Sequence, residues 1–131
     1  TFAYFCTKNN RTFASEMDKG TFRLIMSEET RQFVEGLPQQ ASRKIYHNIY
    51  RVAGGERNKE LFKKLDNTDI WEFRTLYNKM AYRLFAFWDT DTDTLVVATH
   101  GIIKKTQKTP QKEIAKAEAI MRKYFEYKKK H

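Results

Sequence analysis

The chain has 131 residues, of which 40% are hydrophobic, and ten Phe and seven Tyr suffice to fill the core of one domain. No apolar run approaches the roughly 18 residues that a membrane span requires, and Lys8 follows the apolar residues 1–5 too soon for a signal peptide, so we expect a cytoplasmic protein. The net charge of +9 lies mostly in residues 101–131, where ten Lys and Arg stand against three Glu; this favours a phosphate-bearing or acidic partner, although a solvated basic helix explains the charge equally well.

The start of the chain has no clear periodicity. We therefore interpret residues 1–20 as a peripheral N-terminal extension, either native or introduced by cloning. Residues 21–131 form the single predicted domain.

The first half of this domain predicts one strand followed by helices. Residues 21–26 alternate and are rich in β-favouring side chains, which predicts a strand. Ser27 then has the character of a helix N-cap, and Pro38 ends that helix. A second helix is predicted over residues 40–52 from apolar residues at helical spacing, and residues 58–65 are expected to add one more helical turn.

The second half predicts three strands and a final helix. Residues 70–76, 81–88 and 94–100 read as strands joined by short polar turns, and a helix is expected from Pro110 to Tyr127. The element order is β-α-α-β-β-β-α. It predicts an α+β fold in which helices pack on a small, twisted, mainly antiparallel sheet.

Charged residues on the predicted strands form one candidate site. Arg74 and Arg83 lie on adjacent strands, and each guanidinium can hold a phosphate with two hydrogen bonds. The alternation of the strand places Glu72 on the same face as Arg74. A simple surface ion pair between Glu72 and Arg74 is the alternative interpretation.

The run from His100 to Pro110 forms the other candidate site. It follows the last predicted strand and contains a histidine and the lysines Lys104, Lys105 and Lys108. Together these could hold a polyanion and move a proton, since the ordinary pKa of histidine suits proton transfer. A packed structural histidine beside solvated lysines is the competing interpretation.

Several short motifs follow one another between residues 63 and 117 of the chain. They are Lys63-Lys64-Leu65, Ile70 to Arg74, Tyr82-Arg83-Leu84, His100-Gly101, Lys104 to Pro110, Glu113-Ile114 and Ala117. In this order and spacing they resemble the RelE/ParE toxin superfamily, specifically its phage-derived, HigB-like branch. The resemblance covers residues 21–127.

The resemblance implies a microbial RNase-type fold and a toxin of a type II toxin–antitoxin pair. Most such toxins are ribosome-dependent endoribonucleases that cut mRNA without a metal: the 2′-hydroxyl attacks the adjacent phosphate and leaves a 2′,3′-cyclic phosphate and a 5′-hydroxyl. ParE-like members instead inhibit DNA gyrase, which is the alternative function. The implied partners are mRNA, the ribosome and a HigA-like antitoxin with a helix-turn-helix, whose complex with the toxin binds operator DNA.

The resemblance also suggests roles for individual residues. Lys104 and Lys105 match the basic pair after the last strand and are expected to stabilise charge, and Lys105 is the better match to the arginine found in RelE. RelE has a catalytic tyrosine shortly after this basic pair, whereas residues 107–111 contain no Tyr, so another group must transfer the proton. The candidates are His100, Glu72, Tyr82 or a lysine. The predicted catalytic set is Glu72, Arg74, Arg83, His100 and Lys105, and the predicted RNA-binding set is Lys63, Lys64, Tyr82, Lys104 and Lys108.

No metal or cofactor is expected. The histidines, His47, His100 and His131, are scattered along the chain, and Cys6 is the only cysteine. The aspartates at 89, 91 and 93 lack the glycine and terminal glutamate of a calcium loop, and there is no glycine-rich phosphate loop. Trp71 and Trp88 could stack on bases, but aromatic residues in strands usually belong to the core.

Overall fold

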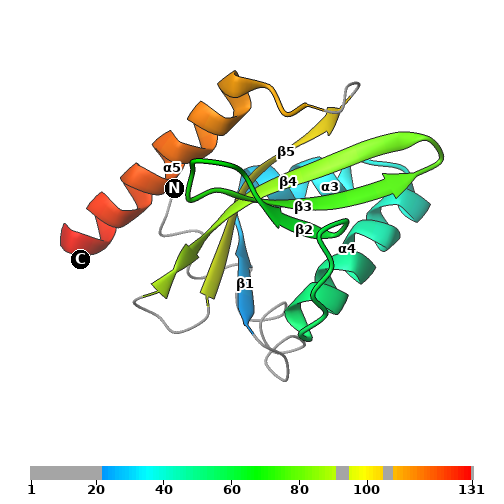
Figure 1. The fold of residues 1–131 in the computed structure, drawn as a ribbon, viewed down its shortest axis with the longest axis horizontal. Helices are drawn as coiled ribbons and strands as arrows, with labels where there is room; N and C mark the ends of the chain where they lie inside the picture. Colours follow the sequence, from blue (N-terminus) through cyan, green and yellow to red (C-terminus); the bar gives the residue numbers. More distant parts are fainter. Residues whose placement is uncertain (1–21, 91–94, 105–107, 131) are drawn as a thin grey trace.

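The computed structural model describes residues 22–90, 95–104 and 108–130 (Figure 1). The predicted extension at residues 1–20 lies outside these ranges. The elements are, in chain order, β1 (Arg23–Met26), α3 (Glu28–Glu35), α4 (Gln39–Ala53), β2 (Phe62–Lys64), β3 (Trp71–Tyr77), β4 (Met80–Asp89), β5 (Leu95–Lys104) and α5 (Gln111–Lys130).

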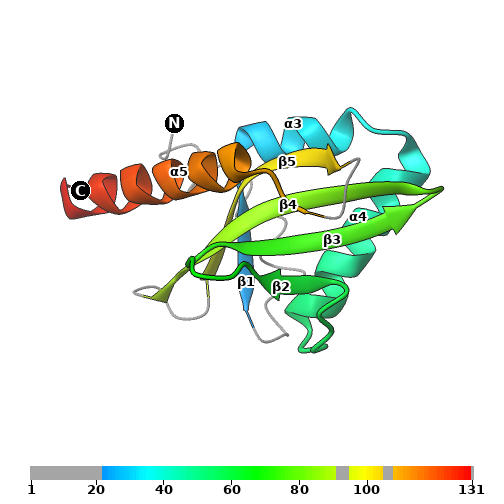
Figure 2. The same cartoon turned by 45° about the horizontal axis from the view of Figure 1, so that its top comes forward.

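The strands form one sheet in the order β1-β5-β4-β3-β2. β1 runs parallel to β5, and the other neighbouring strands are antiparallel. Helices pack on both faces of this curled sheet (Figure 2). The arrangement confirms the predicted α+β class with a mainly antiparallel sheet.

The two faces of the sheet carry separate apolar cores. On one face, α3 and α4 bury Val34, Ala41, Ile45 and Ile49 against the strands, which confirms the apolar stripe predicted for the second helix. On the other face, Ala117 and Tyr124 of α5 pack with residues such as Phe85 and Phe87. Helix α5 covers only part of its face, and this leaves the end of the sheet near the β3–β4 hairpin open to other groups (Figure 1).

Helix α5 is also fixed by a buried carboxylate at the end of β4. Asp89 is fully buried and accepts hydrogen bonds from the Tyr124 hydroxyl at 2.6 Å and from the Lys128 ammonium at 2.7 Å. A buried charge requires such partners, because its desolvation is otherwise costly. Asp89 therefore anchors the C-terminal half of α5 to the sheet.

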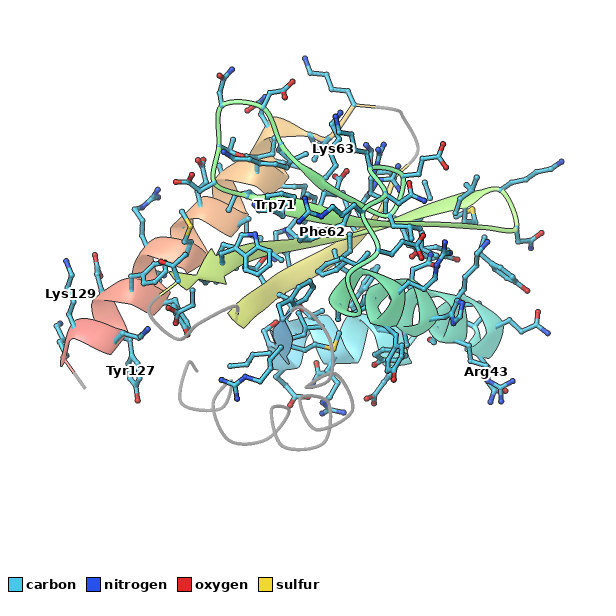
Figure 3. The ribbon with its side chains drawn as sticks, turned by 60° about the horizontal axis from the view of Figure 1, so that its bottom comes forward. Arg43, Phe62, Lys63, Trp71, Tyr127 and Lys129 are labelled. Atoms are coloured by element: carbon cyan, nitrogen blue, oxygen red, sulfur yellow. The ribbon has the colours of Figure 1, made fainter. Side chains whose placement is uncertain are left out.

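The helical turn predicted for residues 58–65 is present only at the start of that segment. One turn does close there, with the amide of Phe62 donating to the carbonyl of Asn58, but the chain then extends as β2. Phe62 pairs with Phe73 of β3, and its ring stacks 4.7 Å from the Trp71 ring (Figure 3). Tertiary pairing with β3 thus decides the conformation of a segment too short to decide it alone.

Other boundaries follow the sequence closely. The Ser27 hydroxyl accepts a hydrogen bond from the amide of Thr30, as expected of an N-cap. The main difference is β5, which continues four residues past the predicted end at His100. His100 therefore lies inside the strand, and Lys104 lies at its end.

Within the described parts of the chain, no helix combines the length and apolar character needed to cross a membrane.

Candidate functional site

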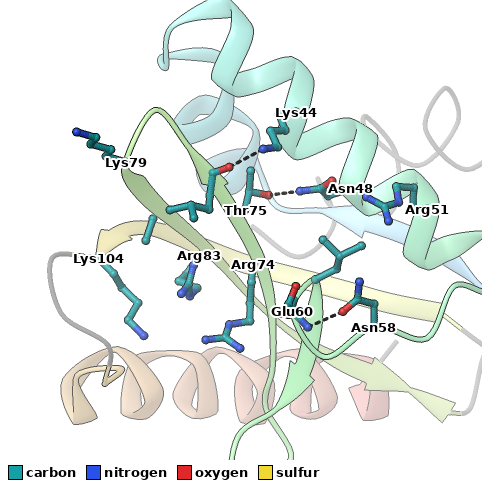
Figure 4. Close-up of a pocket in the computed structure, with 13 residues that line it drawn as sticks. Lys44, Asn48, Arg51, Asn58, Glu60, Arg74, Thr75, Lys79, Arg83 and Lys104 are labelled. Atoms are coloured by element: carbon teal, nitrogen blue, oxygen red, sulfur yellow. Dashed lines mark hydrogen bonds between the residues drawn. The ribbon is translucent and has the colours of Figure 1, made fainter.

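Three cationic side chains meet on the part of the sheet that α5 leaves uncovered. Arg74 of β3 lies directly opposite Arg83 of β4 in the strand register. Lys104 of β5 lies opposite Ala81, two residues from Arg83 along β4 and therefore on the same face. Figure 4 shows the three side chains next to one another, and they line a common cleft.

A buried carboxylate holds the two arginines together. Glu72 is 2% exposed, and its Oε1 lies 3.4 Å from Arg74 Nε and 3.3 Å from Arg83 Nε. Its Oε2 accepts a hydrogen bond of 2.7 Å from the Thr109 hydroxyl. Guanidinium groups on facing strand positions repel each other, and a shared carboxylate offsets this repulsion. The predicted placement of Glu72 on the face of Arg74 is confirmed.

Thr109 connects this carboxylate to the lysine. The Lys104 ammonium donates to the Thr109 hydroxyl at 3.2 Å, and that hydroxyl in turn donates to Glu72. Thr109 was not among the predicted site residues. It lies 37 residues from Glu72 in the chain, and no local pattern indicates such a contact.

Burial changes the proton affinities in this cluster. It lowers the pKa of Lys104, and the charges of Arg83 and Arg74 lower it further, against the opposing effect of Glu72. Burial likewise lowers the pKa of Arg83, although a guanidinium keeps its charge at neutral pH. Lys104 is therefore a cation whose proton is held less tightly than that of an ordinary lysine.

Two cavities lined by described residues adjoin the cluster. The larger, of about 750 Å³, is the cleft lined by Arg74, Arg83 and Lys104, and it continues toward α4. The smaller, of about 240 Å³, shares Arg74 and Lys104 with it and is also lined by Lys63 and Lys108. The structure thus brings together six of the predicted site residues, namely Lys63, Glu72, Arg74, Arg83, Lys104 and Lys108.

Other predicted site residues lie elsewhere. Tyr82 is 5% exposed and belongs to the core under α3 and α4, on the opposite face of the sheet. Lys64 pairs with Trp71 and lines a different cavity, of about 350 Å³, between the tryptophans and α5. Trp71 and Trp88 are half-buried and meet edge to face with ring centres 6.2 Å apart. Lys105 lies outside the described residues.

His100 is an interior residue. It is 1% exposed and its ring packs 4.8 Å from that of Phe85. Nδ1 forms a hydrogen bond of 2.9 Å with the Thr99 hydroxyl, and Nε2 lies 3.2 Å from a carboxylate oxygen of Glu113 on α5. Burial lowers the pKa of His100, which favours the neutral ring. In this position His100 ties α5 to β5.

The site offers fixed positive charge and hydrogen-bond donors. Arg74, Arg83 and Lys104 all carry N–H donors and line the cleft, and Glu60 is the carboxylate among its described lining residues. Across the described ranges there is no group of three or more His, Cys, Asp or Glu side chains placed to hold a metal ion. Such an arrangement suits the binding of a phosphate and the stabilisation of negative charge that develops on it.

Comparison with known proteins gives a family match. Residues 32–122 match the family described as phage derived protein Gp49-like (DUF891), and this span contains every residue of the cationic cluster and Thr109. Among solved structures, the chain is similar to one in the crystal structure of the toxin–antitoxin complex RelBE2 from Mycobacterium tuberculosis, with 17% identity and a TM-score of 0.43 over 66% of this chain and 95% of that chain. No curated protein matches the chain.

Proposed function

The chain belongs to the phage-derived Gp49-like family, a family of RelE/HigB-type toxins, and on this premise we propose that it is a toxin that cleaves mRNA on the ribosome. The family match confirms the resemblance inferred from the motifs of the sequence. The nuclease activity, its ribosome dependence and the roles of individual residues are the content of the proposal.

One observation carries the proposal, which is the meeting of Arg74, Arg83 and Lys104 at a single cleft. Attack of a 2′-hydroxyl on the neighbouring phosphate, with its proton passing to solvent water, creates a pentavalent phosphorus with additional negative charge, and the bond to the 5′-oxygen then breaks. Donors that are already fixed in place stabilise this charge without reorganising during the reaction. Glu72 acts as the counter-ion that fixes the two arginines, and Lys105, which directly follows Lys104, adds further positive charge.

Proton transfer requires a group that reaches the cleft. Glu72 and His100 are buried and their polar atoms are engaged, and Tyr82 lies on the other face of the sheet. Lys104 lines the cleft and its pKa is lowered mainly by burial. We therefore assign Lys104 as the acid that protonates the leaving 5′-oxygen, since an acid works best when its pKa approaches the ambient pH.

The experiment is cleavage of a defined mRNA by the purified protein, with and without ribosomes, read by primer extension. The wild type should cut within translated codons only when ribosomes are present and leave 5′-hydroxyl ends. Arg83→Ala, Lys104→Ala and Lys105→Ala should each slow cleavage by about 10²–10³-fold, as expected for loss of one charge-stabilising donor. Lys129→Gln, at the far end of α5 (Figure 3), is the control and should cleave like the wild type.

Intact mRNA combined with inhibition of DNA supercoiling would identify the chain as a ParE-like gyrase inhibitor and refute the nuclease. Equal cleavage by all variants would show that the site is misplaced.

We also propose a partner protein and a cellular location for the toxin. A cognate antitoxin of the HigA type, with a helix-turn-helix, neutralises the toxin in the cytoplasm, and operator DNA is bound only by the complex. Co-expression with a neighbouring small reading frame that encodes a helix-turn-helix protein should restore growth and yield a stable complex on size exclusion.

A further inference from the structure

The large cleft continues beyond the cationic cluster, past the edge of β3, to helix α4. β2 pairs with residues 71–73 of β3, and the amide of Arg74 donates to the carbonyl of Leu61, so beyond Arg74 that edge faces α4 instead of a strand. The Lys44 ammonium donates to the carbonyl of Leu76 at 2.7 Å, and the Asn48 amide donates to the Thr75 hydroxyl at 3.1 Å. These bonds fix α4 as the far wall of the cleft (Figure 4).

The far part of the cleft is also cationic. Besides the central cluster, the cleft is lined by Lys44 and Arg51 of α4 and by Lys79 of the β3–β4 hairpin, and Glu60 is the carboxylate among its lining residues. Arg51 is already neutralised by Glu56, with Nε 2.8 Å from Oε1. The Lys44 ammonium donates to the Leu76 carbonyl and lies 5.9 Å from the centre of the Tyr77 ring, and among the described residues it pairs with no carboxylate, so it can still donate to an anion.

Lys79 occupies a strained position. The hairpin turn has Asn78 at φ 51° and Lys79 at φ 65°, with Tyr77 paired to Met80. Positive φ at both central residues defines a type I′ turn, which strongly favours glycine at its second position. Lysine tolerates the left-handed region of backbone conformation less well than asparagine does. A strained residue that lines a binding cleft suggests that its side chain is kept for contact with a ligand.

We propose that the α4 side of the cleft is a second phosphate-binding subsite, in which Lys44 and Lys79 hold the RNA backbone next to the phosphate at Arg74 and Arg83. The identity of the polyanion as RNA rests on the proposed function. The ligand is a single-stranded RNA that crosses the β3 edge from the cluster to α4. The cleft volume of about 750 Å³ exceeds the needs of one phosphate group and accommodates a flanking nucleotide.

The test measures binding of a fluorescent, single-stranded 2′-O-methyl RNA, which lacks the attacking hydroxyl, as a function of salt concentration. Each lysine that contacts a phosphate contributes about 0.7 to the slope of log affinity against log salt for a single strand. Lys44→Gln and Lys79→Gly should each reduce the slope by about this amount, and the double variant by about twice as much. Lys129→Gln, outside the cleft, should leave the slope unchanged.

Lys79→Gly supplies a second measurement, because glycine relieves the left-handed backbone. This variant should melt roughly 2–5 °C above the wild type while binding RNA more weakly. If Lys79→Gly melts at a higher temperature but binds RNA as well as the wild type does, Lys79 has no binding role and the proposal for this residue is overturned.

A polyglutamate peptide serves as an alternative polyanion in the same assay. If the variants lose affinity for polyglutamate and keep the RNA slope of the wild type, the cleft binds an acidic peptide and the proposal is refuted. If the wild type cleaves mRNA but Lys44→Gln and Lys79→Gly keep the salt slope of the wild type, this proposal is refuted and the nuclease assignment is left intact. Reduced slopes in a protein that never cleaves RNA would support the subsite and refute the nuclease.

Discussion

The Thr109 hydroxyl offers the sharpest test of how the cationic cluster is held. It accepts from Lys104 at 3.2 Å and donates to Glu72 at 2.7 Å, so it links a cation and its counter-ion through a single oxygen. Thr109→Val keeps the shape of the side chain and removes this oxygen. Thr109→Ser keeps the hydroxyl and removes only the methyl group, and is therefore the matched control.

The cost of Thr109→Val can be worked out from the burial of its partners. Glu72 is 2% exposed, so water does not replace the lost donor. A hydrogen bond to a charged group contributes about 1.5–3 kcal/mol. An unfolding entropy of about 2.1 cal/mol/K per residue converts this to a fall in Tm of roughly 5–11 °C for a domain of this length. Thr109→Ser should lower the Tm much less, because it keeps the hydroxyl.

The functional consequence follows from the position of Lys104. Without the Thr109 oxygen the Lys104 ammonium loses one of the hydrogen bonds that position it, so kcat should fall about tenfold for a misplaced catalytic group while KM stays constant. Thermal melting and single-turnover RNA cleavage measure the two effects. If the Val and Ser variants melt at the same temperature and cleave at the same rate, the hydroxyl does not organise the cluster and the reasoning fails.

Two further predictions concern β5. Because burial lowers the pKa of His100 from its ordinary value of 6.5, the unfolded chain takes up a proton that the folded chain refuses as the pH falls below 6.5. The free energy of unfolding should therefore decrease, by at most about 1.4 kcal/mol per pH unit, between pH 6.5 and the lower folded pKa. Urea denaturation of His100→Gln should show a weaker pH dependence of the free energy of unfolding than the wild type shows. An identical pH dependence would mean that His100 is not its cause. Gly101→Ala should destabilise the fold by about 1–3 kcal/mol, because the new Cβ would lie 2.6 Å from Phe33 Cε2 and 2.7 Å from Leu84 Cδ2, and Phe33→Leu in the same chain should restore part of the loss in thermal melting.

The sequence predicts the elements whose patterns are set locally. Alternation in residues 70–76 reports the two faces of β3, and Ser27 marks the start of α3 through its side-chain hydrogen bond. β2 escapes prediction because its three residues are extended by pairing with β3. A segment of that length carries no periodicity of its own.

The end of β5 explains most of what the sequence misplaces in the site. A strand that ended at His100 would present this histidine at the mouth of the sheet. Gly101 instead permits close contact with Phe33 of α3, and the strand continues to Lys104. His100 is thereby placed in the interior, and Lys104 takes the position at the cleft. The link through Thr109 joins segments 37 residues apart, which no local pattern can encode.

The parallel pairing of β1 with β5 has a consequence for biosynthesis. The strand made earliest among those described hydrogen-bonds to the strand made last, and the sheet order places no other strand beside it. Contacts so distant in sequence form slowly. A nascent chain that still lacks β5 also lacks Lys104. The cluster of positive charges can therefore form only after β5 has been synthesised and has left the ribosome.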